Sequence, residues 1–176
     1  MQALKQAITE LTDAGALLFP CNALEKGVLE TVEISTPVDL ESDYVGLFEL
    51  NQQNPPLHLN AHLYLDSERN LIPLRRRLQE LYQSFGMELK LDAGAEQPDH
   101  LTVELEFLAY LYNECVRAGV GEGKWPLEKV SDGITSIQKE LSWVPAFVNQ
   151  LEHRSNHPFY VPLGRFLVAV LGAGQG

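Results

Sequence analysis

Cysteine and long apolar runs are both scarce in this sequence. Its 176 residues contain two cysteines, Cys21 and Cys115, which form neither a C-x-x-C pair nor a metal-ligand spacing. We therefore expect both to be small buried hydrophobic side chains of a protein kept in a reducing compartment. No run approaches the ~18 apolar residues of a membrane span, and the N-terminus has no signal-peptide core. The sequence predicts a cytoplasmic protein without a membrane segment.

Positive charge is also in short supply. Thirteen lysines and arginines face 24 aspartates and glutamates, which gives a formal net charge of −11. This balance argues against binding a phosphate backbone and so against nucleic acid as a partner. It favours a cationic partner or none, although acidity can also serve only to keep a protein soluble. The hydrophobic content of 45% suffices for the core of a single domain over residues 1–176.

Catalytic motifs are missing as well. No serine lies in a G-x-S-x-G turn, no glycine run has the spacing of a phosphate-binding loop, and the glycines over 119–123 follow no strand. His58 and His62 stand four residues apart, but they follow a double proline in a predicted loop and lack the glutamate of an H-E-x-x-H motif. We predict no catalytic residues, no metal site and no cofactor.

The alternative function is one in which a histidine takes part in catalysis or nucleotide binding. His100 with Glu104 or Glu106 could serve a small helical hydrolase or nucleotide-binding protein. Glu104 lies four residues after His100 and shares its helix face, whereas Glu106 projects almost oppositely. The two carboxylates are therefore not a paired acid and base, and we expect the chain not to be an enzyme.

Apolar residues recur at spacings of three and four along most of the chain, and no segment alternates convincingly like a strand. The pattern predicts an all-α fold of about seven helices, with the longest irregular loop between Asn51 and Asp66. Helical segments are expected over residues 3–18, 22–32, 39–50, 72–85, from about 100, 125–141, 142–151 and 158–170. Arg75 to Arg77 are expected on a solvated face near Glu80, and His157 at a helix junction as a surface or capping group.

The segment from Glu96 to Tyr112 joins a helix-start signal to the most apolar helical run. Asp99 is the predicted N-cap, accepting hydrogen bonds from the backbone of Leu101 or Thr102, so the helix should begin at about His100. The run after it has so little polar surface that other helices should surround it.

Residues 97–108, Gln-Pro-Asp-His-Leu-Thr-Val-Glu-Leu-Glu-Phe-Leu, closely resemble the TorD/NarJ family of assembly chaperones for molybdenum-cofactor oxidoreductases. The resemblance continues at residues 44–48, 54–57, 81–87, 143–147 and 157–160 and spans roughly residues 40–168. In the order and spacing of these segments, the chain is most similar to the NarJ branch, which serves type II dimethyl sulfoxide reductase family enzymes. The loop over residues 57–62 departs from the usual sequence of this branch, so the client enzyme stays open.

The resemblance implies an all-helical, non-catalytic chaperone with about seven helices around the central helix. Its partner would be the catalytic subunit of a molybdenum oxidoreductase, bound through its N-terminal leader of the twin-arginine kind and held as apo-enzyme until the cofactor is inserted. It also implies a monomer, with a domain-swapped dimer as the alternative.

An amphipathic, arginine-bearing leader would lay its apolar side chains into an aromatic groove while the acidic chain attracts its positive charges. In this interpretation Asp99 caps the helix and faces a cation, and His100 supplies a hydrogen bond. The alternative, that residues 98–100 only start a helix, stays open. The predicted contact residues are Tyr44, Leu47, Phe48, Pro98, Asp99, His100 and Glu104.

Overall fold

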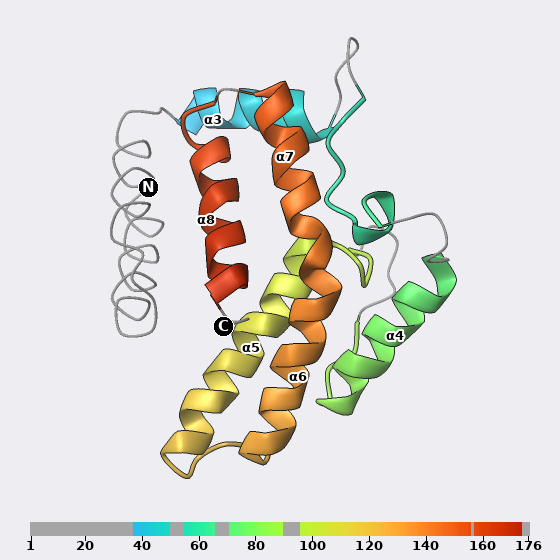
Figure 1. Ribbon diagram of the computed structural model, residues 1–176, viewed down its shortest axis with the longest axis vertical. Helices are drawn as coiled ribbons and strands as arrows, with labels where there is room; N and C mark the ends of the chain where they lie inside the picture. Colours follow the sequence, from blue (N-terminus) through green and yellow to red (C-terminus); the bar gives the residue numbers. More distant parts are fainter. Residues whose placement is uncertain (1–36, 50–54, 66–70, 90–95, 156, 174–176) are drawn as a thin grey trace. The chain divides into compact units, whose positions relative to one another are not determined.

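The computed structural model describes residues 37–49, 55–65, 71–89, 96–155 and 157–173, and its regular elements in these ranges are all helical (Figure 1). The all-α prediction is confirmed, and the described residues pair as strands only at an isolated antiparallel bridge between Asn60 and His100. The predicted helices over 3–18 and 22–32, together with Cys21, lie outside the described residues.

The chain divides into two compact units, which we describe separately. One unit contains the residues up to Leu57 together with those from Val144 onward, and the other is His58–Trp143. The single domain expected from the sequence stays a prediction.

The unit His58–Trp143 contains three α-helices: α4 (Leu71–Ser84), α5 (Leu101–Gly119) and α6 (Leu127–Glu140). Short 3₁₀ turns lie at Ala61–Leu63 and Leu141–Trp143. Helices α5 and α6 lie side by side (Figure 1). Gly133 of α6 lets the ring of Phe85 pack closely against this helix, because a Cβ at Gly133 would lie 2.6 Å from that ring.

Helix α5 buries one face rather than its whole circumference. Its buried residues recur at intervals of three or four, as expected for an amphipathic helix, while Thr102, Glu106 and Ala109 are exposed. Helix α5 therefore packs against its unit through one apolar stripe. The buried side chains are Leu101, Glu104, Phe107, Leu108, Leu111 and Glu114.

The glycine-rich connection between α5 and α6 follows the sequence prediction. Gly121 adopts a φ of 79°, which favours glycine. A Cβ at Gly123 would lie 2.7 Å from the backbone of Ala118, so that position also requires a glycine. The buried Glu114 carboxylate accepts a hydrogen bond from the Lys124 N–H at 2.8 Å and fixes the loop.

The other unit contains α3 (Pro37–Tyr44), a π-helix at Val45–Glu49, α7 (Val144–Arg154) and α8 (Tyr160–Ala173). Helix α3 covers Pro37–Tyr44 of the described residues, and the π-helix continues from it through Glu49 of the helical segment expected at 39–50. Helices α7 and α8 pack side by side (Figure 1). Their contact is close at Gly164, where a Cβ would lie 3.2 Å from Val148.

Candidate functional site

The turn at residues 98–100, which leads into α5, is built differently from the sequence prediction. The N-cap of α5 is His100, whose Nδ1 accepts a hydrogen bond from the Thr102 N–H at 3.3 Å. The prediction of Asp99 as the cap is wrong. The Leu101 N–H instead donates to the Leu59 carbonyl at 2.7 Å. The helix begins at Leu101, one residue from the predicted start.

Asp99 is not the cap because its carboxylate binds groups from two other segments. Its side chain is 0% exposed. Oδ1 accepts a hydrogen bond from Arg75 Nε at 2.7 Å, and Oδ2 lies 2.5 Å from His62 Nδ1. Burial raises the pKa of Asp99, but the hydrogen bonds from His62 and Arg75 outweigh it and lower the pKa overall. The cation that Asp99 faces therefore belongs to its own chain.

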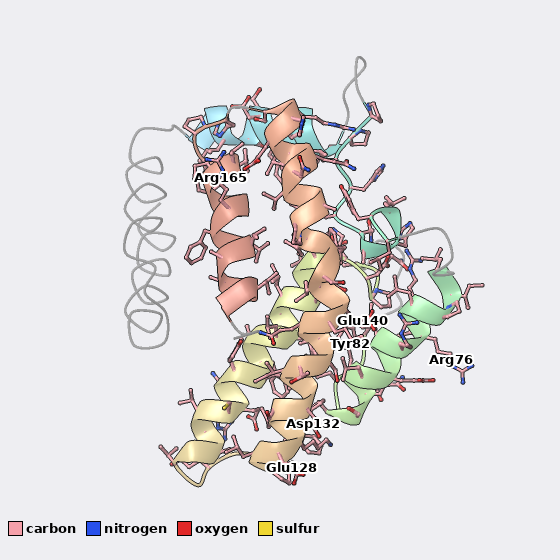
Figure 2. The ribbon with its side chains drawn as sticks, in the orientation of Figure 1. Arg76, Tyr82, Glu128, Asp132, Glu140 and Arg165 are labelled. Atoms are coloured by element: carbon pink, nitrogen blue, oxygen red, sulfur yellow. The ribbon has the colours of Figure 1, made fainter. Side chains whose placement is uncertain are left out.

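The pairing of Arg75 corrects the expectation that Arg75 to Arg77 all lie on a solvated face. Arg76 is exposed and pairs with Glu80 at 2.8 Å, as predicted for a solvated face. Arg75, by contrast, is turned toward Asp99, because a buried carboxylate needs a charged or hydrogen-bonding partner. In Figure 2, Arg76 projects from α4 away from α6, whereas Tyr82 lies on the side of α4 nearer α6.

Pro98 is also part of the buried structure. Its carbonyl accepts a hydrogen bond from the Tyr82 hydroxyl at 2.9 Å, and the Tyr82 ring lies 4.8 Å from that of Phe107. Burial, and then the negative charges of Glu104 and Asp99, raise the pKa of Tyr82 above its ordinary value. Tyr82 therefore stays a neutral hydrogen-bond donor to the turn.

Glu104 lies inside the unit and not on a binding surface. It is 0% exposed, and its Oε2 accepts a hydrogen bond from Trp143 Nε1 at 2.9 Å. Oε1 has no hydrogen-bond partner among the described residues. Burial raises the pKa of Glu104 to about 8, against the opposing effect of the Trp143 hydrogen bond. At neutral pH this carboxyl group is mostly protonated.

His100 and Glu104 do not form a catalytic pair. His100 Nε2 lies 3.4 Å from the exposed carboxylate of Glu96, whereas Glu104 bonds to Trp143 in the core. Nothing in this geometry supports the rival hydrolase. The described residues also contain no group of three or more histidine, cysteine, aspartate or glutamate side chains that could hold a metal ion.

A second candidate surface lies in the unit that contains α3, and we call it the aromatic surface (Tyr44, Phe48, Phe147, Phe159 and Tyr160). The Phe48 ring lies 5.0 Å from Tyr44, 5.7 Å from Tyr160 and 6.4 Å from Phe147. Tyr44 is 39% exposed, whereas Phe147, which contacts the Phe48 ring, is buried. Leu47 is half-buried, and its carbonyl accepts a hydrogen bond from the Leu57 N–H at 2.8 Å.

His157 assembles this aromatic surface. Its Nδ1 accepts hydrogen bonds from the N–H groups of Phe159 at 3.1 Å and Tyr160 at 3.5 Å, which confirms the predicted capping role. Its Nε2 lies 2.9 Å from Asp43 Oδ2, and the Tyr160 hydroxyl donates to the Leu40 carbonyl at 2.7 Å. Burial, and then the nearby charge of Asp43, raise the pKa of Tyr160. These contacts tie α8 to α3.

The predicted contact residues fall in both units. Tyr44, Leu47 and Phe48 belong to the unit with α3, and residues 98–100 belong with Glu104 to the unit His58–Trp143. Sequence reasoning missed Tyr160, Asp43 and the bridging role of His157. The His-Pro-Phe-Tyr match at residues 157–160 was the signal that could have pointed to them.

The described residues thus form helical units, one of which has a partly exposed aromatic surface. The family model described as nitrate reductase delta subunit matches residues 2–149, so the chain belongs to that family, the NarJ/TorD family. A relative is named as an assembly chaperone, and the predictions of the family and of a non-enzymatic protein are confirmed.

One relative is the chlorate reductase assembly chaperone protein of Ideonella dechloratans. It is 31% identical over 114 residues, which are 64% of this chain and 58% of the relative. The match thus covers less than two thirds of that protein's length. No solved structure matches this chain. None of the helices in the described ranges is long and apolar enough to cross a membrane.

Proposed function

We propose that this chain is a cytoplasmic assembly chaperone for the catalytic subunit of a molybdenum-cofactor oxidoreductase. It binds the N-terminal leader and the apo form of that subunit and holds them until the cofactor is inserted and the enzyme is assembled or exported. Membership of the nitrate reductase delta subunit family and the name of the chlorate reductase relative support the proposal.

The observation that carries the leader-binding part is the aromatic surface and the acidic stretch beside it. Residues 37–49 contain four carboxylic acids and no lysine or arginine. Tyr44 and Val45 of this stretch are 39% and 38% exposed. Exposed aromatic rings offer a large contact area at small entropic cost. An amphipathic helix can bury its apolar face on such a surface while its basic residues meet the carboxylates.

The turn at residues 98–100 has a more limited role in this proposal. Asp99 and Pro98 are buried. The Asp99 carboxylate already accepts a hydrogen bond from Arg75, and the Pro98 carbonyl accepts one from Tyr82. From this turn, His100 would offer a partner a hydrogen bond through Nε2, in place of its contact with the exposed carboxylate of Glu96 at 3.4 Å. Asp99 acts inward and holds the turn in place.

The proposal is tested by titrating the purified chain with a synthetic leader peptide from the catalytic subunit encoded beside it. We expect a dissociation constant of about 1–10 μM by calorimetry, which corresponds to roughly 7–8 kcal/mol. Tyr44→Ala should weaken binding about tenfold because it removes an exposed ring from the aromatic surface.

Val116→Ala is the matched control, since Val116 is an exposed apolar residue of α5 outside that surface. Its affinity for the peptide should equal that of the wild type. No heat of binding at ~100 μM peptide would contradict leader binding. Failure of the tagged chain to co-purify with the cofactor-free catalytic subunit would contradict the chaperone function itself.

A further inference from the structure

Asp43 occupies a distinctive position beside the aromatic surface. It lies next to Tyr44 at the end of α3, and its side chain is 51% exposed. One of its oxygens, Oδ2, lies 2.9 Å from Nε2 of His157, whose own side chain is only 12% exposed. The carboxylate therefore has a fixed neighbour on one side and solvent on the other.

The ring of His157 is held in one orientation. Because Nδ1 accepts hydrogen bonds from the N–H groups of Phe159 and Tyr160, the ring proton is assigned to Nε2, the nitrogen that faces Asp43. The contact restrains the Asp43 side chain. Because the Asp43 side chain is 51% exposed, its other oxygen, Oδ1, can accept a hydrogen bond from outside.

The neighbours of Asp43 define which group would fit. The side chain of Tyr44 is partly exposed at the adjacent position, and residues 37–49 supply no cation of their own. A planar guanidinium can pair with a carboxylate and stack on an aromatic ring at the same time. An ammonium group is a compact, strongly hydrated point charge and lacks the flat face for stacking. This combination selects arginine over lysine.

We infer that Asp43 and Tyr44 form the acceptor for an arginine side chain of the client leader, with His157 as the residue that positions Asp43. The inference rests on the proposed leader binding and specifies its chemistry. Asp99, which the sequence suggested for this role, is fully buried and already bonded to Arg75. Asp43 is accessible where Asp99 is not.

The test is a double-mutant cycle that combines Asp43→Asn in the chain with an arginine-to-glutamine change in the peptide. The probes are the synthetic leader peptide carrying one arginine at the border of its apolar face, and its glutamine and lysine versions. With wild-type chain, arginine to glutamine should weaken binding about five- to tenfold, and lysine should recover only part of the loss. With Asp43→Asn, the arginine and glutamine peptides should bind within about twofold of each other.

Glu41→Gln is the matched control. Glu41 is an exposed carboxylate of α3 two residues earlier, so it points to another side of the helix. This variant should keep the full preference for the arginine peptide. His157→Asn, which retains a helix-capping oxygen, should lose much of that preference while the melting temperature changes little.

Three outcomes separate the hypotheses. Additive losses in the cycle, or equal effects of Asp43→Asn and Glu41→Gln, would overturn the inference while leaving leader binding intact. Absence of binding by the wild-type chain to every peptide would overturn the proposed leader binding and the inference with it. Loss of the arginine preference in Asp43→Asn alone would support the inference.

Discussion

Replacing Glu104 by glutamine should change how stability depends on pH. Folding moves the pKa of this carboxyl group from its ordinary value of 4.5 to about 8, because burial disfavours the charged form. Glutamine keeps the shape and an oxygen that accepts the Trp143 hydrogen bond, but it cannot ionise. The variant therefore isolates the cost of charging this one buried group.

The sign follows from proton binding. Between pH 4.5 and about 8 the folded state keeps the Glu104 proton that the unfolded chain has released. The free energy of unfolding therefore falls as pH rises across this window. The contribution of the protonated group is fully present below pH 4.5 and is lost as pH rises through about 8. A tenfold change in proton affinity is about 1.4 kcal/mol, so the full effect is on the order of 5 kcal/mol.

Chemical denaturation at a series of pH values, followed by far-ultraviolet circular dichroism, measures this effect. Between about pH 5 and pH 9 the wild type should lose roughly 3–5 kcal/mol more than Glu104→Gln. Glu106→Gln is the control, since Glu106 is exposed two residues further along α5 and should keep the wild-type slope. Parallel pH profiles for the wild type and Glu104→Gln would refute the reasoning.

Two further substitutions test the turn before α5. Asp99→Asn should destabilise the chain by about 2–3 kcal/mol at pH 7, because Arg75 and His62 lose a charged partner. Its pKa is lowered, so this difference should be present above about pH 4 and fade as acid protonates the wild-type group, as denaturation at pH 7 and pH 3 would reveal. His100→Ala should weaken leader binding about three- to tenfold in calorimetry while the melting temperature falls by about 2–4 °C, the cost of one helix cap. A collapse of stability with unchanged binding would mean that residues 98–100 only start the helix.

The helices of the described region were predictable because their signals are local. Spacings of three and four, a glycine break and a proline start all act within one or two turns of the residues concerned. The start of α5 was therefore predicted to within one residue. The identity of its cap was not predicted, because Asp99 pairs with Arg75 and His62, which lie 24 and 37 residues away in the sequence. Competition for a carboxylate over such separations leaves no periodic signal.

The position of Glu104 could have been read from the sequence. Leu101, Leu108 and Leu111 precede or follow it by three, four and seven residues, which places it in the middle of the apolar stripe of α5. Its acidic character suggested a surface role instead. The bridge from His157 to Asp43 had no comparable local signal, because these residues are 114 positions apart and come together only when α8 packs on α3.

The acidic residues of this chain perform two separate tasks, and burial distinguishes them. Buried carboxyl groups are compensated within their own unit: Asp99 by Arg75, Glu114 by Arg117 and the Lys124 N–H, and Glu104 by keeping its proton. Exposed carboxylates such as Asp43 carry much of the net charge of −11. Charge that is compensated inside a fold attracts no partner, whereas exposed charge beside apolar surface steers and selects one. Under the proposed leader binding, the exposed acids of α3 and the π-helix after it are the ones that lie beside the aromatic surface. Substitutions of the buried acids should instead act mainly through stability.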